Sequence, residues 1–189
     1  FSMDGRNEMR LLIIGAGGHG RCCKDIASRM GIYETIDFLD DQMQEDLPIV
    51  GTIDQLRQLQ NKYDHVFTAI GNNGIRKKND EMIKEEKKTN LIDPTAILSS
   101  SAQIGKSNVI FPYTSIESKA LIGDGCILCA NSVINHDATI CNYVLIYTNT
   151  TIRPNTTIKD EVKIGSNCCI CMGTNIEERQ VIEDGKTID

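Results

Sequence analysis

The sequence has no basic excess and no long apolar run, and we expect no targeting segment. Its 189 residues include 20 Lys+Arg against 26 Asp+Glu, a net charge of -6, which argues against a protein that binds duplex nucleic acid. No apolar run approaches the roughly 20 residues that a membrane span needs. No basic start precedes an apolar segment, as it would in a signal peptide. We therefore expect a cytoplasmic, globular protein without a nucleic-acid partner and without a membrane span.

The first part of the chain has the pattern of a strand, a glycine turn and a helix. An apolar run over 10–14 ends in Gly15-Ala-Gly-Gly-His-Gly20, and the residues that follow, 21–30, have a helical pattern. In this context the glycines let backbone N–H groups approach a phosphate at the helix N-terminus. His19 lies inside the turn, where it could either cap the helix or contact a ligand.

Two further strands are expected over 35–39 and 65–70. The first ends at the acidic pair Asp40-Asp41, the place where such folds hold a ribose or a base, and the second is followed by Gly71-Asn72-Asn73. The segment before the second strand, 51–62, suggests a short helix.

A strongly charged helix is expected over 76–88, with its charges on a solvated face. Residues 9–90 have room for only one βαβαβ half, so we expect an α/β half-Rossmann domain that binds one nucleotide. The alternative is a degenerate domain that binds nothing and only covers the rest of the chain.

A six-residue repeat begins at Ile92. Every sixth residue from there to Ile188 is Ile or Leu, without a slip. Such a period excludes an α-helix and indicates a left-handed parallel β-helix, whose coils close every eighteen residues with three short strands. Residues 91–189 are expected to form a prism of about five such coils. Glycine follows the aliphatic residue at 105, 123 and 165, where we expect tight corners.

The eight cysteines include two Cys-x-x-Cys pairs, a spacing typical of zinc sites. In the six-residue register, however, Cys126 and Cys168 fall on small inward positions of different faces, more than two coils apart. The two pairs cannot share a metal within this fold, so we expect packing residues and no metal. A three-histidine metal site is excluded too, because only one of the three histidines lies in the repeat.

That histidine is His136, two positions after the interior Ile134, at a corner where its side chain should point outward. An imidazole suits a general base because its ordinary pKa is near neutral. Asp137 follows it and could hold the tautomer. A surface histidine beside an acid is the alternative. Catalysis is favoured by a fold-level analogy, since acyltransferases dominate the hexapeptide prisms.

Several motifs in this order resemble one family. They are Gly15-Ala-Gly-Gly-His-Gly20, Phe38-Leu-Asp-Asp41, Ala69-Ile-Gly-Asn-Asn73, Ile75-Arg-Lys-Lys78 and Val133-Ile-Asn-His-Asp137. The chain resembles the bacterial sugar acetyltransferases of the hexapeptide-repeat superfamily. These comprise the UDP-4-amino-sugar N-acetyltransferases of bacillosamine-type synthesis and the related sialic acid O-acetyltransferases.

The resemblance implies a homotrimer in which the N-terminal domain holds a UDP-sugar and the prism holds acetyl-CoA between subunits, without a metal. His136 would be the general base, beside Asp137. The nucleotide sugar would contact Gly17, Gly18, His19, Asp40, Asp41 and Gly71. Contacts to CoA would come from Leu145, Met172 and Gly173.

This chain departs from the family in two places. Leu145 stands where the family often has a second histidine, and residues 156–161 look like an extra hexad. The leading expectation is N-acetylation of a nucleotide-linked amino sugar. The alternatives are O-acetylation of sialic acid or a related sugar hydroxyl, and a non-catalytic trimeric protein that binds a sugar nucleotide.

Overall fold

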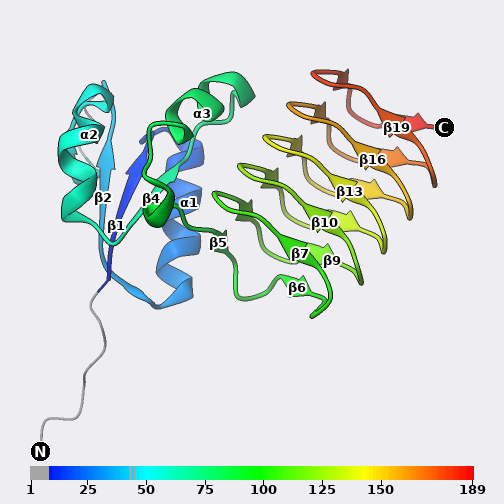
Figure 1. Cartoon of the computed structure of the whole chain (residues 1–189), viewed down its shortest axis with the longest axis horizontal. Helices are drawn as coiled ribbons and strands as arrows, with labels where there is room; N and C mark the ends of the chain where they lie inside the picture. The colour runs from blue at the N-terminus through cyan, green and yellow to red at the C-terminus, as the bar shows by residue number, and fades with distance from the viewer. Residues whose placement is uncertain (1–8, 43, 45) are drawn as a thin grey trace, which may run out of the picture.

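A computed structural model describes residues 9–42, 44 and 46–189 of this chain, and it consists of an α/β layer beside a three-sided prism (Figure 1). The layer contains a parallel sheet of strand order β3-β2-β1-β4. Its strands are β1 (Met9–Ile14), β2 (Tyr33–Leu39), β3 (Ile49–Gly51) and β4 (His65–Thr68). β1 pairs on both sides, so its residues from Leu11 to Ile14 are all fully buried, which explains the uninterrupted apolar run.

The helices of the layer flank this sheet. They are α1 (Gly18–Met30), α2 (Leu56–Leu59) and α3 (Asn73–Asp80), with 3-10 turns η1 (Ile53–Gln55), η2 (Gln60–Lys62) and η3 (Glu85–Lys87). α1 ends where Gly31 adopts the left-handed conformation, with φ 68°. The half-Rossmann expectation is confirmed by this arrangement.

The expectation for the charged segment 76–88 is wrong in extent, and its solvated face is found for most of the charges, such as Lys78, Lys84 and Glu86, but not for Arg76 and Asp80. α3 ends at Asp80, and Arg76, Asn79 and Asp80 are buried. The reason is tertiary: α3 packs against the prism, where Arg76 donates to the carbonyl oxygens of Gly125 and Tyr143 and Asp80 Oδ2 accepts from Tyr143 Oη.

The prism consists of two-residue strands spaced six residues apart. They are β5 (Leu91–Ile92), β6 (Ile97–Leu98), β7 (Gln103–Ile104), β8 (Val109–Ile110), β9 (Ser115–Ile116), β10 (Leu121–Ile122), β11 (Ile127–Leu128), β12 (Val133–Ile134), β13 (Thr139–Ile140), β14 (Leu145–Ile146), β15 (Thr151–Ile152), β16 (Thr157–Ile158), β17 (Lys163–Ile164), β18 (Cys169–Ile170), β19 (Asn175–Ile176), β20 (Val181–Ile182) and β21 (Thr187–Ile188). Every third strand pairs in parallel, in the orders β20-β17-β14-β11-β8-β5, β21-β18-β15-β12-β9-β6 and β19-β16-β13-β10-β7. We call these three faces the β5, β6 and β7 sheets.

The second residue of every one of these strands is the aliphatic residue of the repeat, and it points into the prism. Successive coils stack in register, for example Ile122 on Ile140 and Ile140 on Ile158. The interior is therefore a column of isoleucine and leucine with small residues between them. The predicted left-handed β-helix of about five coils is confirmed, and the segment 156–161 is an ordinary part of it, containing β16.

The corners of the prism repeat with the same period. One residue in the left-handed region occurs at every sixth position from Ser107 to Gly185, and most of these residues are not glycine. The expectation that Gly105, Gly123 and Gly165 form the corner turns is wrong, because none of them has a positive φ. They are needed for close stacking instead: a Cβ at Gly105 would lie 2.7 Å from the carbonyl oxygen of Gly123 in the next coil.

The α/β layer covers the β5 sheet. The outward residues Leu91, Val109, Ile127 and Leu145 pack with side chains of the layer in one buried cluster. Burial of each such aliphatic side chain stabilises the folded protein by roughly 1.5–3 kcal/mol. These outward residues therefore hold the layer and the prism together. Within the described residues, no helix combines the length and apolar character required to cross a bilayer.

Candidate active site

The glycine loop between β1 and α1 contains glycines of two kinds. A Cβ at Gly15 would lie 2.9 Å from the carbonyl oxygen of Ala69, and one at Gly20 would lie 2.1 Å from that of Gly15. These two glycines are needed by the fold itself. A Cβ added at Gly17, Gly18 or Gly71 would have no neighbouring atom within 4 Å, and none of the three has a positive φ. Nothing within the described chain requires glycine there, whereas close approach of a ligand would.

The acidic pair at the end of β2 holds neighbouring loops. Asp40 Oδ2 accepts a hydrogen bond from the backbone N–H of Ala16 at 2.6 Å, and its Oδ1 accepts one from Gln42 at 2.8 Å. Asp41 Oδ1 accepts from the N–H of Ile53 at 3.1 Å. Asp40 thus fixes the glycine loop from the side that a ribose would approach.

His19 lies between α1 and the prism. Its ring stacks on Phe111 with centroids 5.9 Å apart, and its Nε2 lies 3.7 Å from Cys23 Sγ. Burial, and then the charge of Arg76, lowers the pKa of His19 to about 4. The imidazole is therefore neutral near pH 7. In the described part of the chain the polar contact of the ring is with Cys23, inside α1, and not with a backbone N–H of the first turn.

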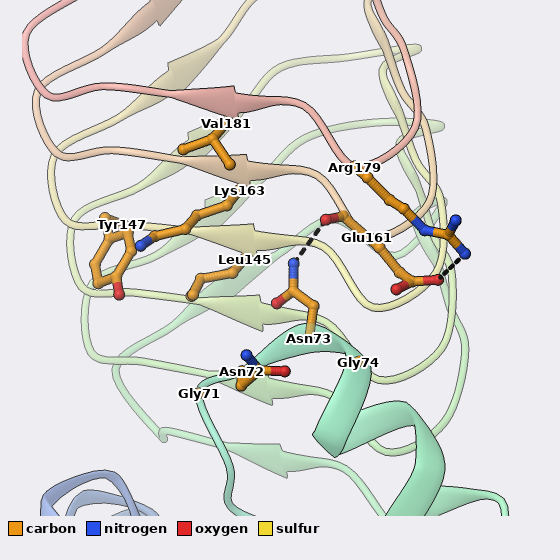
Figure 2. Close-up of a pocket in the computed structure, with 10 residues that line it drawn as sticks. All are labelled: Gly71, Asn72, Asn73, Gly74, Leu145, Tyr147, Glu161, Lys163, Arg179 and Val181. Carbon is orange, nitrogen blue, oxygen red and sulfur yellow. Dashed lines mark hydrogen bonds and ion pairs between the residues drawn. The ribbon is translucent and has the colours of Figure 1, made fainter.

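A notch of about 470 Å³ lies where the layer stops covering the β5 sheet (Figure 2). One wall is the loop 71–74 that follows β4, and the other includes Tyr147, Lys163 and Val181. Lys163 is the first charged outward residue of the β5 sheet, and its Nζ lies 5.4 Å from the centre of the Tyr147 ring. Leu145 also lines this notch, on the face that carries the layer.

His136 lies on the edge between the β6 and β7 sheets. Its Nδ1 is 2.7 Å from Asp137 Oδ2, and the two side chains are 53% and 44% exposed. Asp137 is one of the left-handed corner residues, with φ 59°, a conformation that aspartate tolerates. With a proton on Nδ1 toward Asp137, Nε2 remains as the basic nitrogen, as a general base requires.

A cavity of about 470 Å³ opens beside His136 on the β6 sheet. It is lined by Ile97, Leu98, Ser99, Ser115, Ile116, Glu117, Ser118 and His136. Glu117, one coil earlier, accepts a hydrogen bond on Oε2 from the backbone N–H of His136 at 2.9 Å. The catalytic candidate therefore has a carboxylate on each side, Asp137 at its ring and Glu117 at its backbone.

The proposed CoA contacts separate into two places. Met172 and Gly173 lie on the same prism edge as His136, two coils further along, and Met172 is 58% exposed. Leu145 is not on that edge. In a three-sided prism the edge between two sheets lies opposite the third sheet, so the His136 edge faces away from the α/β layer of its own chain.

The predicted site residues thus form two groups. Gly17, Gly18, Asp40 and Gly71 meet at the carboxyl ends of β1, β2 and β4, while His136, Asp137, Met172 and Gly173 share the opposite edge of the prism. No group of three His, Cys, Asp or Glu side chains in the described part of the chain is placed to hold a metal. Cys126 and Cys168 are buried in the prism interior.

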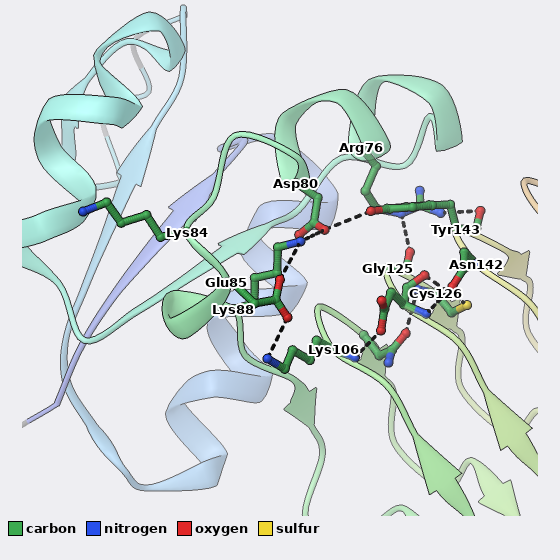
Figure 3. A network of polar contacts seen from close by, with 12 residues as sticks. Arg76, Asp80, Lys84, Glu85, Lys88, Lys106, Gly125, Cys126, Asn142 and Tyr143 are labelled. Carbon is green, nitrogen blue, oxygen red and sulfur yellow. Dashed lines mark hydrogen bonds and ion pairs between the residues drawn. The ribbon is translucent and has the colours of Figure 1, made fainter.

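Two residues of this region were missed by sequence reasoning. Glu117 could have been found by coil arithmetic, since it precedes Asn135, the neighbour of His136, by one eighteen-residue coil. Arg76 lies in the Ile75-Arg-Lys-Lys78 motif of the resemblance, but as part of a run of charges it was assigned no role of its own. It is 1% exposed and joins α3 to the prism (Figure 3).

Comparisons with known proteins agree with this architecture. Residues 10–83 match the family model of the PglD N-terminal domain, and residues 101–136 match that of the bacterial transferase hexapeptide. The acetyltransferase domain of PglB from Neisseria gonorrhoeae is 30% identical, with a TM-score of 0.90 over 96% of this chain and 91% of that one.

Two more distant structures share the fold. PerB from Caulobacter crescentus is 19% identical, with a TM-score of 0.72 over 88% of this chain and 91% of that one. WeeI from Acinetobacter baumannii is 20% identical, with a TM-score of 0.75 over 95% of each chain. The identity and coverage of the PglB domain confirm the resemblance seen in the motifs: the chain belongs to the hexapeptide-repeat sugar acetyltransferases that carry a PglD-type N-terminal domain.

Proposed function

We propose that this protein is an acetyl-CoA-dependent N-acetyltransferase that acts on a nucleotide-linked amino sugar. Residues 9–90 would hold the nucleotide sugar and residues 91–189 would transfer the acetyl group. The observation that carries the proposal is the exposed His136–Asp137 pair, with 2.7 Å between Nδ1 and Oδ2, beside a cavity on a prism edge.

The comparisons support this choice of donor and acceptor. The PglB acetyltransferase domain, 30% identical to this chain, has a structure in complex with acetyl-CoA. The PerB structure contains CoA and GDP-perosamine. For this chain we propose a UDP-4-amino-4,6-dideoxy sugar as the acceptor.

The nucleotide sugar would bind at the carboxyl edge of the α/β sheet. Gly17, Gly18 and Gly71 leave space beside the backbone, which allows a diphosphate to approach the first turn of α1. Asp40 holds the loop beneath it, and Asp41 lies next to Asp40 on the ribose side. The neutral ring of His19 closes the site toward the prism.

The acetyl transfer needs one base. His136 Nε2 removes a proton from the acceptor amine while the amine nitrogen attacks the thioester carbonyl. The new C–N bond forms, the C–S bond breaks, and the proton passes from the imidazolium to the departing CoA thiolate. Asp137 stabilises the imidazolium, and backbone N–H groups of a neighbouring coil would bind the oxyanion.

The carboxylate of Glu117 supports an amine as the acceptor group. It lies in the cavity beside His136, where a negative charge attracts a sugar ammonium and gains little from a neutral hydroxyl.

A homotrimer would bring the two halves of the site together. In one chain the nucleotide loops and His136 lie on opposite sides of the prism, so a neighbouring chain must supply one of them. The outward strand positions of the β6 and β7 sheets carry no charge along the described length. They are Ile97, Ser115, Val133, Thr151, Cys169 and Thr187, and Gln103, Leu121, Thr139, Thr157 and Asn175. Such faces suit packing between subunits.

CoA would follow the His136 edge past Met172 and Gly173. Two coils separate them from His136, about 10 Å along the prism, which leaves the thioester near the base. Leu145 lines the notch on the β5 sheet and would reach an acyl donor only on the neighbouring chain.

The test is thiol release from acetyl-CoA with a UDP-4-amino-4,6-dideoxy sugar, using the wild type, His136→Ala and Asp137→Asn. We expect acceptor-dependent release that falls by about 100-fold or more in His136→Ala. Asp137→Asn keeps a residue that tolerates the corner conformation, so it should retain the fold and lose about tenfold in kcat.

Other outcomes would change the assignment. Release that His136→Ala does not reduce would place the chemistry elsewhere. Release with sialic acid alone would make the protein an O-acetyltransferase. Binding of UDP without binding of acetyl-CoA would identify a non-catalytic nucleotide-binding protein.

A further inference from the structure

We infer that Arg76 is a positioning residue that fixes the nucleotide-sugar loop against the prism and thereby sets the affinity for the acceptor. The inference rests on the proposed function, because that function places the nucleotide sugar against residues 70–73, which lead from β4 into α3. It concerns a residue that touches neither substrate.

The guanidinium of Arg76 uses its five N–H groups on five acceptors. Nε donates to the carbonyl oxygen of Gly125 at 2.7 Å, and Nη2 donates to that of Tyr143 at 2.9 Å. These two residues occupy equivalent corners of adjacent coils, eighteen residues apart. Arg76 therefore holds α3 to two coils of the prism at once.

The remaining donors hold the loop that follows β4. Nη1 donates to the carbonyl oxygens of Ile70 and Gly71, both at 3.0 Å, and Nη2 also donates to Asn73 Oδ1 at 2.9 Å. The loop is tied a second time by Asn73, whose Nδ2 donates to the carbonyl oxygen of Glu161 at 2.8 Å. Arg76 and Asn73 thus both connect this loop to the prism, and Figure 3 shows the hydrogen bonds of Arg76 on the prism side.

The hydrogen bonds of the Arg76 guanidinium form a set that other side chains could not replace. A buried cation costs free energy unless it is well paired, and burial lowers the pKa of Arg76 to about 10. The five acceptors of its hydrogen bonds are all uncharged oxygen atoms. The nearby acid Asp80 instead accepts from Tyr143 Oη at 3.0 Å and pairs with Lys88 Nζ at 3.1 Å. Only a planar fork with five donors can satisfy this set of carbonyls.

These bonds orient the peptides that line the notch. The carbonyl oxygens of Ile70 and Gly71 point toward Arg76, so in trans peptides the N–H groups of Gly71 and Asn72 point away from it. Gly71 and Asn72 both line the notch (Figure 2). Arg76 therefore determines which backbone groups the loop presents to the acceptor.

The test compares Arg76→Lys with Tyr143→Phe. Lysine keeps the charge but not the fork, so the loop loses part of its attachment. Phenylalanine removes the Tyr143–Asp80 hydrogen bond from the same interface and leaves the loop untouched, which makes it the control for domain docking. For each variant we would measure kcat, both KM values, the melting temperature, and UDP binding by calorimetry.

We expect Arg76→Lys to raise the KM for the nucleotide sugar and the Kd for UDP by about tenfold, the loss of one or two charged hydrogen bonds. The KM for acetyl-CoA should change less than about twofold. Tyr143→Phe should lower the melting temperature and leave both KM values unchanged. Equal changes of both KM values in Arg76→Lys, or none, would overturn the inference.

Two further controls keep the outcome decisive. If Arg76→Lys does not fold, Asn73→Ala removes one of the three loop acceptors at a half-buried position, and the same split between the KM values is expected. If the wild type neither turns over the amino sugar nor binds UDP, the proposed function fails, and this inference fails with it. A working wild type with an unchanged KM in the variants refutes Arg76 alone.

Discussion

The two kinds of glycine in the β1–α1 loop predict opposite effects of the same substitution. Gly18 and Gly20 are two residues apart in the first turn of α1. Gly18→Ala places a methyl group in open space, whereas Gly20→Ala places one 2.1 Å from the carbonyl oxygen of Gly15. One substitution tests the proposed ligand and the other tests the packing of the loop.

The magnitudes follow from these surroundings. Alanine at Gly18 gains part of the roughly 1 kcal/mol by which alanine exceeds glycine in a helix, so the melting temperature should stay or rise by about 2 °C. Alanine at Gly20 forces the loop to move, at about 2–3 kcal/mol, and should lower the melting temperature by about 5 °C or more. The KM of Gly18→Ala for the nucleotide sugar should nevertheless rise about tenfold, because the methyl group occupies the approach of the diphosphate.

Thermal unfolding and steady-state kinetics on the same preparations measure both effects. Gly18→Ala should be at least as stable as the wild type and should bind the nucleotide sugar more weakly. Its KM for acetyl-CoA serves as the internal control and should not change. A normal KM for the nucleotide sugar in Gly18→Ala would show that no ligand approaches this turn, and the proposed acceptor site would be wrong.

Two further predictions concern stability. The pKa of His19 is lowered to about 4 by burial. As the pH falls, His19 therefore binds a proton in the unfolded protein before it does so in the folded one. The stability it contributes should be present above pH 6.5 and be lost, up to about 3 kcal/mol, as the pH falls to 4. Urea unfolding at several pH values should show a flatter curve for His19→Phe, and parallel curves would contradict the shift. In the prism, Ile146→Ala should cost about 2–5 kcal/mol, because Ile146 is fully buried in a middle coil. Ile182→Ala, at a partly buried position, should lower the melting temperature less than half as much, and equal losses would refute this gradient.

The prism could be predicted from the sequence because its structure repeats with its pattern. Each interior position carries Ile or Leu, and each coil reproduces the one before, so the position of every strand follows from the first. The glycines expected at the corners, Gly105, Gly123 and Gly165, show the limit of this reasoning. Gly105 is required by the carbonyl of Gly123 in the next coil, a contact that a single repeat does not reveal.

The contacts between the two parts were harder to predict. The outward residues Leu91, Val109, Ile127 and Leu145 are apolar at intervals of eighteen, a signal that one face of the prism is covered. Arg76 belongs to one of the motifs that resemble the family, yet nothing in that motif predicts its burial. Its burial depends on carbonyls of Gly125 and Tyr143, and backbone acceptors have no signature in a run of side chains.

The residues of the candidate site were predicted one by one, and their arrangement in two groups was not. The pairing of His136 with Asp137 followed from their adjacency, and the structure places these side chains in contact. Leu145 was assigned because it stands where the resembling family often has a second histidine, nine residues after the catalytic one. Nine residues are half a coil, so this spacing carries the chain to another face of the prism.

The stacking of coils in register also restricts how this protein can change its length. An insertion of six or twelve residues would keep the aliphatic residues inside but move every later strand to another face, and an insertion that is not a multiple of six would break the column of isoleucines. His136 and Met172 remain on the same edge of the prism only if whole coils are added or removed between them. Each such step changes the separation along the prism by about 4.8 Å. Relatives that accommodate acyl donors of different reach would therefore be expected to differ from this chain in multiples of eighteen residues.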